Sequence, residues 1–509
     1  MSLKESPESE KRIGIWYYST KTEGIGGFIK TRPSDFVVRE VTAREERDER
    51  EERDEREKRD EREERDEREE RDEREERDER EERDEREERE KREKREEGKY
   101  LILELTKENW DTYGVVREIS RRLRVSKNRI GFAGTKDKFA VTTQRISIWG
   151  EGIGEREVER VKIKGVSLRK LGRSKKAVHL GDLRGNEFEI LVRGVEGGGG
   201  EGGGEGEGGG ESEIKRKIEA TTAEIEAAGG VPNFFGVQRF GLNRPLTHLI
   251  GKRLTRGEIK EAVLCYISDI FPDETEDAKQ ARRLCRLEEK GGEGGLEGLK
   301  AGLKKMPAFL RHEKAMLNEL VRGGKESLNE ADFRSAFSVF PKNLQKLFVH
   351  AYQAYLFNLV LSRRKRQGLP FNEALVGDFV CFRSELERAE RVTEEKVEAV
   401  NRLVKRGRAF VTAPLFGYET EFAGGEAGEI ERAVLEEEGC ELSDFFIHKF
   451  PEMSSKGTRR AVLVPVKVRL CSDGISEDEL NPGRKKVRLN FFLPKGSYAT
   501  VVLREYLKS

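Results

Sequence analysis

The sequence predicts an α+β protein. Three observations support this prediction: apolar and polar residues alternate in segments near both ends of the chain, apolar residues recur at helical spacing elsewhere, and a glycine-punctuated turn leads into one of the alternating segments. A strand has a period of two residues and a helix a period near 3.6, so both kinds of element are expected. Two further segments contain almost no apolar residues and cannot contribute to a core.

Three segments are expected to form strands from their apolar patterns. Residues 100–105 form a short apolar run that is typical of a buried strand. Residues 141–148 alternate between two faces directly after the glycine-punctuated turn, and residues 485–491 alternate in the same way near the C-terminus.

Two segments are expected to form helices. Residues 112–123 have helical spacing, and Asp111 stands where its carboxylate can cap the first turn. Residues 345–363 repeat leucine and tyrosine at helical spacing, a pattern that belongs more often to a core than to a functional surface.

A run of charge interrupts the chain. All 54 residues from Arg44 to Glu97 are charged, and residues 45–86 consist of seven hexads, six of them Glu-Glu-Arg-Asp-Glu-Arg and one Glu-Lys-Arg-Asp-Glu-Arg. The run has no apolar seam, so it is neither core nor coiled coil. Glu-to-Arg pairs four residues apart would allow a lone helix of about 80 Å, and disorder is the competing state. We interpret the run as a spacer inserted in a loop, with no part in catalysis.

The formal net charge of zero is the sum of two acidic segments and a basic rest of the chain. The charged run carries −12, and a glycine-rich segment with six glutamates, residues 194–213, carries −6. The rest of the chain therefore carries +18, as expected of a protein that binds nucleic acid. Residues 194–213 are expected to form a flexible linker.

Cysteine usage and hydropathy suggest a cytoplasmic protein. The five cysteines lie far apart without CxxC spacing, which predicts a reducing compartment and neither a disulfide framework nor a zinc site. Residues 1–11 are polar, and the chain contains no run of about 18 apolar residues, so we expect no signal peptide and no membrane association.

The turn before residue 141 is the segment best suited to chemistry. It places one carboxylate, Asp137, between Lys136 and Lys138, and neighbouring cations favour the charged form of a carboxylate. Gly131 and Gly134 would permit unusual backbone angles or a close approach to a ligand. An ionised Asp137 could act as nucleophile or base. The alternative is an ordinary surface turn with scattered charges.

Five sequence blocks stand in order along the chain. They are 27–40 (Gly-Phe-Ile-Lys-Thr-Arg-Pro-Ser-Asp-Phe-Val-Val-Arg-Glu), 131–144 (Gly-Phe-Ala-Gly-Thr-Lys-Asp-Lys-Phe-Ala-Val-Thr-Thr-Gln), 180–188 (Leu-Gly-Asp-Leu-Arg-Gly-Asn-Glu-Phe), 231–241 (Val-Pro-Asn-Phe-Phe-Gly-Val-Gln-Arg-Phe-Gly) and 493–505 (Leu-Pro-Lys-Gly-Ser-Tyr-Ala-Thr-Val-Val-Leu-Arg-Glu). Together these blocks resemble the TruD family of tRNA pseudouridine synthases, and five ordered blocks are a far more specific signal than one short motif. In that family, the aspartate at the position of Asp137 is the catalytic residue.

The resemblance implies an isomerase that converts uridine, at position 13 of tRNA in the family's usual case, to pseudouridine. The uracil must be flipped out of the folded RNA to be reached. The reaction moves a base on its own ribose, so we expect no cofactor, no small-molecule partner and no metal. Lys136 is followed by Asp137 where a P-loop would have Ser or Thr, in agreement with this expectation. The partner would be tRNA, and we favour a monomer.

The resemblance also implies three substrate-binding residues. Lys30, at the end of an expected strand over residues 28–30, would be the buried cation that keeps Asp137 charged. Asn233 would pair with the edge of the uracil, and Phe235 would stack on it. From the residues alone, Lys136 and Lys138 compete with Lys30, although neighbours on a turn usually point outward. A pair of core phenylalanines is the alternative interpretation of Phe234 and Phe235. Three weaker candidates lie in the same blocks, namely Asn186, Arg239 and Arg504.

The implied architecture is the pseudouridine-synthase fold, a mainly antiparallel sheet with flanking helices, carrying a TruD-specific α/β insertion. The expected segments are 12–43, 98–242 and 462–509 for the catalytic domain, 44–97 for the charged insertion, 194–213 for the linker, and 243–461 for the TruD insertion.

Two other functions compete with the enzyme. One is a catalytically idle protein that binds or folds RNA on the same scaffold, although such a protein would not need to retain Asp137. The other is a scaffold whose charged run spaces two partners apart.

Overall fold

The computed structural model describes residues 3–42, 98–150, 153–196, 209–286, 295–322, 324, 327–383 and 385–508. The expected lone helix or disorder of residues 44–97 lies outside the described residues. The chain divides into two compact units, and each is described by itself. The sheet unit comprises residues 25–216 and 467–496, and the helical unit comprises residues 1–24, 217–466 and 497–509.

The sheet unit is built around one eight-stranded sheet with the order β13-β14-β6-β1-β4-β2-β5, in which β3 pairs with β4 away from this path. Only the β1–β4 pair is parallel among these strands. The strands are β1 (Phe36–Val41), β2 (Tyr100–Glu108), β3 (Ile130–Phe132), β4 (Val141–Trp149), β5 (Val166–Ser174), β6 (Gly185–Val195), β13 (Arg469–Glu477) and β14 (Lys485–Pro494). The unit's short helices are η1 (Pro33–Asp35), α4 (Thr112–Leu123), η2 (Lys127–Arg129) and α5 (Glu155–Glu159).

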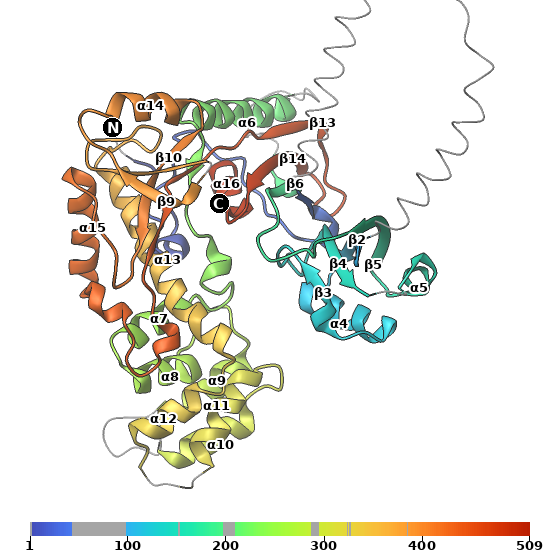
Figure 1. Cartoon of the computed structure of the whole chain (residues 1–509), viewed down its shortest axis with the longest axis vertical. Helices are drawn as coiled ribbons and strands as arrows, with labels where there is room; N and C mark the ends of the chain where they lie inside the picture. Colours follow the sequence, from blue (N-terminus) through green and yellow to red (C-terminus); the bar gives the residue numbers. More distant parts are fainter. Residues whose placement is uncertain are drawn as a thin grey trace, which may run out of the picture. The chain divides into compact units, whose positions relative to one another are not determined.

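One face of this sheet is covered by α4, shown in cyan in Figure 1. Val115, Val116 and Ile119 of α4 are buried against leucines of β2 and isoleucines of β3 and β4. The Asp111 carboxylate accepts a hydrogen bond from the backbone N–H of Gly114 at 2.7 Å, which caps the helix as the sequence predicted.

Arg193 of β6 holds the segment between residues 28 and 35. Its backbone N–H donates to the carbonyl of Phe28 at 2.8 Å, and its carbonyl accepts from the N–H of Phe28 at 2.9 Å. Its guanidinium forms a bidentate pair with Asp35, at 2.9 and 3.0 Å, and a further bond to Asp478 at 2.8 Å. All three side chains are buried, so these charges depend on one another for compensation.

The helical unit contains the remaining elements. Its helices are α1 (Glu8–Lys11), α7 (Thr247–Thr255), α8 (Ile259–Ser268), α9 (Glu276–Leu284), α10 (Leu296–Lys305), α11 (Arg311–Val321), α12 (Glu330–Phe337), α13 (Lys342–Arg366), α14 (Val397–Lys405), α15 (Gly425–Glu438) and α16 (Ala499–Leu507), with short turns η3 (Val237–Arg239), η4 (Leu442–Phe445) and η5 (Pro451–Met453). Its strands form a sheet of order β11-β10-β8-β9 and a pair β12-β7, made of β7 (Val231–Pro232), β8 (Phe379–Phe382), β9 (Glu385–Arg391), β10 (Ala409–Leu415), β11 (Thr458–Ala461) and β12 (Leu463–Val464). One more helix, α6 (Gly209–Ala227), contains the boundary between the two ranges.

The central helix of this unit is α13. Its residues are buried on nearly every side between Gln345 and Arg364, because α7, α15 and β10 all pack against it. Helices α8 to α12 form a cluster of their own, drawn in green and yellow in Figure 1. The prediction of a core helix over residues 345–363 is therefore confirmed.

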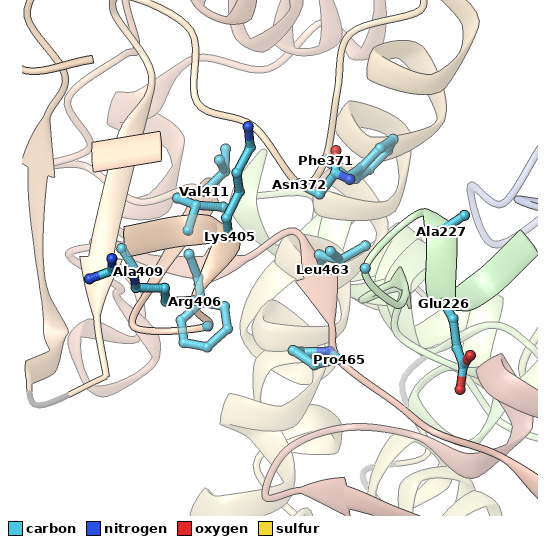
Figure 2. A pocket seen from close by; sticks show the side chains of 14 residues that line it. Glu226, Ala227, Phe371, Asn372, Lys405, Arg406, Ala409, Val411, Leu463 and Pro465 are labelled. Carbon is cyan, nitrogen blue, oxygen red and sulfur yellow. The ribbon is translucent and has the colours of Figure 1, made fainter. Parts of the chain in front are cut away.

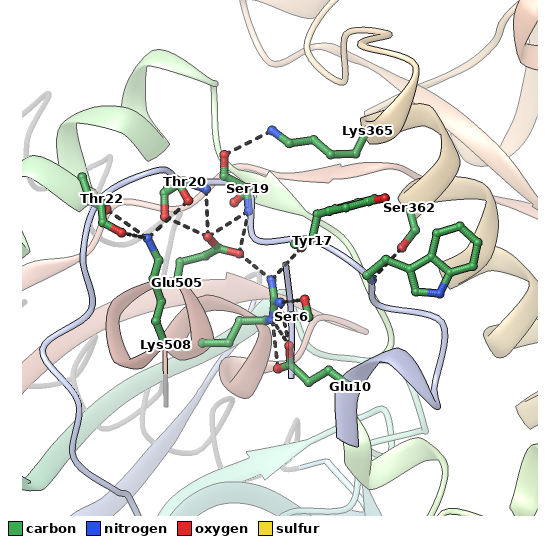
Figure 3. A network of polar contacts seen from close by, with 12 residues as sticks. Ser6, Glu10, Tyr17, Ser19, Thr20, Thr22, Ser362, Lys365, Glu505 and Lys508 are labelled. Atoms are coloured by element: carbon green, nitrogen blue, oxygen red, sulfur yellow. Dashed lines mark hydrogen bonds and ion pairs between the residues drawn. The ribbon is translucent and has the colours of Figure 1, made fainter. Parts of the chain in front are cut away.

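The two ends of the chain are tied together within the helical unit by a cluster that we call the terminal clasp (Figure 3). Arg504 of α16 donates to the carboxylate of Glu10 in α1 at 2.6 Å, and Glu505 accepts from the backbone N–H groups of Ser19 and Thr20 at about 3.0 Å. Burial of Arg504 is compensated by these carboxylates, so this weaker sequence candidate has a structural role.

The α+β class and the mainly antiparallel sheet are confirmed. Residues 100–105, 141–148 and 485–491 all lie in strands, and residues 112–123 form α4. These predictions succeeded because each segment's periodicity matches the face that it buries.

Two local predictions differ from the structure. Residues 28–30 do not form a strand, since Phe28 makes only an isolated bridge to Arg193. The two ends of the expected linker over 194–213 belong to regular elements, since residues 194–195 end β6 and residues 209–213 begin α6, and the residues between 196 and 209 lie outside the described residues. The division into catalytic and insertion domains stays a prediction. Within the described residues, no helix is long and apolar enough to cross a bilayer.

Replacing Arg193 by Met should lower the free energy of unfolding by about 3–5 kcal/mol, because it leaves the buried carboxylates of Asp35 and Asp478 without a cation. Urea unfolding would measure this loss. The matched control is Arg488→Met in the same sheet, whose pair with Glu189 is partly exposed and should contribute about 0–1 kcal/mol. Equal losses in the two variants would contradict the assigned importance of Arg193.

Candidate active site

The turn between β3 and β4 places Asp137 beside Lys30. The ammonium of Lys30 donates to the Asp137 carboxylate at 2.6 Å, across 107 residues of sequence. The side chain of Asp137 is 40% exposed and that of Lys30 is 23% exposed, so both groups of the pair remain partly accessible to solvent. The sequence-predicted partners therefore meet.

Lys30 reaches this position from an unusual backbone conformation. Its φ angle is +63°, in the left-handed region that residues with a Cβ rarely adopt. Its ammonium also lies 4.1 Å from the centroid of the Phe36 ring, a cation–π contact. The two ends of this segment are held by Arg193, so the surrounding structure maintains the strained residue.

Lys136 does not compete with Lys30 for Asp137. Its side chain is only 5% exposed, and its ammonium donates to Glu40 of β1 at 2.6 Å. The expectation that the turn's lysines point outward is therefore wrong for Lys136. A buried glutamate on β1, which is distant in sequence, draws it inward.

The backbone of Asp137 is held by Lys107, a residue that the sequence analysis missed. Lys107 lies at the end of β2 with no exposed surface, and its ammonium donates to the carbonyl of Asp137 at 2.8 Å and to that of Trp110 at 2.6 Å. Burial lowers the pKa of Lys107 to about 8, and the negative charge of Asp137 opposes that shift. The sequence did contain an indication that Lys107 is buried, because Lys107 occupies the next inward-facing position of the strand after Leu101, Leu103 and Leu105.

Two more buried polar groups fix the same turn. The hydroxyl of Thr112 accepts from the backbone N–H of Lys136 at 3.0 Å, and the amide of Gln144 donates to the carbonyl of Gly134 at 3.1 Å. The turn is thus anchored by β1, β2, α4 and β4, while the carboxylate of Asp137 stays partly exposed to solvent.

Gly131, which lies in β3 just before the turn, has a packing role. A Cβ on Gly131 would lie 2.2 Å from the carbonyl oxygen of Val178 and 2.8 Å from the hydroxyl of Ser147, so any larger residue would force the backbone apart. Gly134 has no such contact, since its nearest neighbour would be 3.7 Å away. The close approach of the Val178 backbone therefore explains why residue 131 is a glycine.

Asn233 and Phe235 lie together in the helical unit, after β7. The amide of Asn233 donates to the carbonyl of Ala461 at 2.9 Å, and its side-chain oxygen accepts from Arg460. Phe235 is 7% exposed and packs edge-on against Phe357, with a ring-centroid distance of 5.6 Å. Phe235 thus also belongs to the hydrophobic core, as the alternative interpretation expected.

Asn358 of α13 fixes the backbone of Phe235. Its side-chain oxygen accepts from the N–H of Phe235 at 2.8 Å, and its amide donates to the Phe235 carbonyl at 3.0 Å and the Ile13 carbonyl at 2.9 Å. This completely buried asparagine therefore sets the position of the phenyl ring. The indication in the sequence was a polar side chain directly after Leu356 and Phe357 and before Leu359.

The structure thus brings Lys30 to Asp137 in the sheet unit and Asn233 to Phe235 in the helical unit. That all four residues line one pocket stays a prediction. The weaker candidate Asn186 lies in β6, where its side-chain oxygen finds no hydrogen-bond partner in the described chain.

A cavity of about 440 Å³ in the helical unit lies away from these residues (Figure 2). Phe371, Val411 and Leu463 contribute apolar surface, and Lys405 and Arg406 bring positive charge. None of the four predicted site residues lines it. Across the described residues, no group of three or more His, Cys, Asp or Glu side chains is arranged to hold a metal ion.

Comparisons with known proteins agree on one family. The family model for "tRNA pseudouridine synthase D (TruD)" matches residues 12–62 and 75–506. A Methanosarcina mazei protein described as "Probable tRNA pseudouridine synthase D" is 46% identical, covering 99% of this chain and 98% of its own length. A Thermococcus sibiricus protein with the same description is 34% identical over 96% of this chain and 97% of its own. A crystal structure of a TruD protein from Methanosarcina mazei matches with a TM-score of 0.73 and 45% identity, covering 99% of each chain.

Stability should depend on pH through Lys107. Its pKa is about 8 in the folded chain against an ordinary 10.5, so the unfolded chain binds more protons between these values. The free energy of unfolding should therefore rise with pH across this window, and Lys107→Met should remove that contribution. Urea unfolding below the window and near its upper end measures it, with the exposed Lys300→Met as control. A constant difference between wild type and Lys107→Met at the two pH values would contradict the assignment.

Proposed function

The chain belongs to the TruD family of tRNA pseudouridine synthases, and on that premise we propose that Asp137 is its catalytic carboxylate, acting on uridine 13 of tRNA. The observation that supports this proposal is the ion pair between Lys30 and Asp137, 2.6 Å long and partly open to solvent. Enzymes of this family are isomerases, so the product keeps every atom of the uracil and ribose except the exchanged proton.

The reaction breaks the bond from ribose C1′ to N1 of uracil and forms a bond from C1′ to C5. The hydrogen on C5 leaves as a proton, and N1 gains one. A carboxylate near the ribose can serve as nucleophile at C1′ or as base in the formation of a glycal, and Asp137 suits either role. The anchored backbone of Asp137 allows the carboxylate to meet the sugar in one orientation.

Lys30 would keep this carboxylate charged while the RNA covers it. A closing base removes water from Asp137, which penalises the charged form, and a neighbouring ammonium offsets that penalty. The conformation of Lys30 supports this role, because the strain is located next to the proposed catalytic group.

Asn233 and Phe235 would hold the flipped-out uracil. The side-chain amide of Asn233 uses one donor for Ala461 and its oxygen accepts from Arg460, so one donor and one lone pair are left for the uracil edge. Phe235 shows little exposed surface, so the base would contact the accessible part of its ring.

The alternative of a catalytically idle RNA-binding protein gains no support from the family membership. The ion pair at Asp137 also disfavours this alternative, because an idle scaffold has no need for a partly exposed carboxylate on a turn that four contacts hold in place. The scaffold alternative concerns residues 44–97, which lie outside the described residues.

Asp137→Asn should abolish turnover, since the amide is neither nucleophile nor base. Release of tritium from C5-labelled uridine in tRNA measures the reaction directly, and a gel-shift assay should show that tRNA binding is largely kept. The exposed Asp273→Asn, in the loop before α9, is the matched control and should keep full activity. Residual tritium release at the wild-type rate would remove Asp137 from the mechanism.

Phe235→Ala should slow turnover through lost stacking on the uracil, an effect of about 1–3 kcal/mol. Because Phe235 also packs in the core, the thermal midpoint should be measured alongside kcat and KM. Phe357→Leu, which alters the same core contact from the far side, serves as control. If both variants lose stability equally and neither loses activity, Phe235 contributes only to the core.

A further inference from the structure

Several buried or largely buried arginines in the described part of the chain are paired with carboxylates. Burial lowers the pKa of Arg244 and Arg459. Arg244 lies 3.2 Å from Glu313, and Arg459 forms an ion pair with Glu431. The buried Arg193 follows the same pattern. Each carboxylate compensates the cost of taking a cation out of water.

Arg239 departs from this pattern. It ends the turn η3, four residues after Phe235, and burial lowers the pKa of its guanidinium. Only the Tyr498 phenol opposes that shift, and no carboxylate does. Its Nε is buried, with no hydrogen-bond acceptor in the part of the chain that the structure describes. The residue keeps partial exposure, so a ligand from solvent can reach it.

A second arginine approaches the same ring. The guanidinium carbon of Arg460, on β11, lies 4.2 Å from the Phe235 ring centroid, and that of Arg239 lies 5.8 Å from it. Burial lowers the pKa of Arg460 to about 10, and the positive charge of Arg239 acts in the same direction. Arg460 also donates to Asn233. Two mutually repelling cations therefore flank the residues proposed to hold the uracil.

Placing two cations close together in a partly dry site is unfavourable unless an anion joins them. Guanidinium groups match the geometry of phosphate, with which they form two parallel hydrogen bonds. A nucleotide carries a phosphate on the same unit as its base, so a site for the base is expected to lie near a site for phosphate. The arrangement thus has the chemistry of a phosphate site next to a base site.

We propose that Arg239, together with Arg460, binds a backbone phosphate of the RNA beside the target uridine. This proposal rests on the proposed function in so far as Asn233 and Phe235 receive the base. A substitution of Arg239 tests this proposal more specifically than one of Arg460, since the Nε–H of Arg239 has no acceptor among the described residues.

A binding role and a structural role for Arg239 predict opposite effects on stability. A structural cation that is removed weakens the fold. An uncompensated buried cation weakens the fold while it is present, so its replacement by an apolar side chain of similar length should leave the thermal midpoint unchanged or raise it. Loss of RNA affinity without loss of stability is therefore the signature of the proposed site.

The experiment measures binding of an unmodified tRNA transcript at several salt concentrations, with Asp137→Asn as the background so that no turnover occurs. Adding Arg239→Met should weaken binding at least tenfold and make the slope of log K against log salt shallower by about 0.7–0.9, the value for one phosphate contact. The thermal midpoint should not fall. The matched control is Arg244→Met, which should lower the midpoint and leave the slope unchanged.

An unchanged salt slope in the Arg239→Met variant would overturn the proposal. Should that variant not fold, Arg239→Lys is tested instead. This variant keeps the charge but loses the planar fork of the guanidinium, and wild-type affinity in it would overturn the proposal.

Addition of inorganic phosphate tests whether the anion bound at this site is free phosphate instead of an RNA phosphate. If it stabilises wild type but not Arg239→Met while the tRNA slope is unchanged, the site holds free phosphate and the RNA assignment is wrong. Failure of Asp137 as catalyst would instead appear as tritium release by Asp137→Asn, which leaves these binding results unaffected.

Discussion

The ion pair between Lys30 and Asp137 is the contact on which the candidate active site depends, and much of the sheet unit holds it in place. On one side, Arg193 binds the backbone of Phe28 and the carboxylate of Asp35, and so fixes both ends of the segment that carries Lys30. On the other side, Lys107 binds the carbonyl of Asp137. The carboxylate that we propose as catalytic is therefore held in one orientation in the free protein, which is the condition for efficient positioning of a catalytic group.

The buried cations differ in whether a carboxylate is paired with them. Arg193 and Arg504 are paired with carboxylates and stabilise the fold, one in the sheet unit and the other in the terminal clasp. Lys136 is paired in the same way with Glu40. Arg239 has no such partner among the described residues, and it lies beside the ring proposed to receive the substrate base. A protein that binds a polyanion can leave a cation uncompensated where its ligand completes the pair.

Much of the fold could be predicted from local patterns. The strand over 141–148 and the helix over 112–123 were predicted because their apolar periodicity matches the face that each buries. The segment 28–30 was assigned wrongly as a strand, since its conformation is set by a bridge to Arg193, distant in sequence, and includes a left-handed residue. The role of Lys107 was missed because a lysine near the end of a strand is normally expected to be exposed. Its burial becomes understandable only once its two buried carbonyl acceptors are known.

The sequence by itself determined the family and the sheet and helix segments, and it singled out Asp137 as the candidate catalytic carboxylate. Only the tertiary structure decided which cation faces that carboxylate. Lys30 and Lys136 were both available, and a turn does not specify where its long side chains go. Glu40 on β1 takes Lys136 into the interior, and Arg193 brings Lys30 to the surface of the site. Side-chain direction at a turn is set by contacts with strands distant in sequence, which local periodicity does not encode.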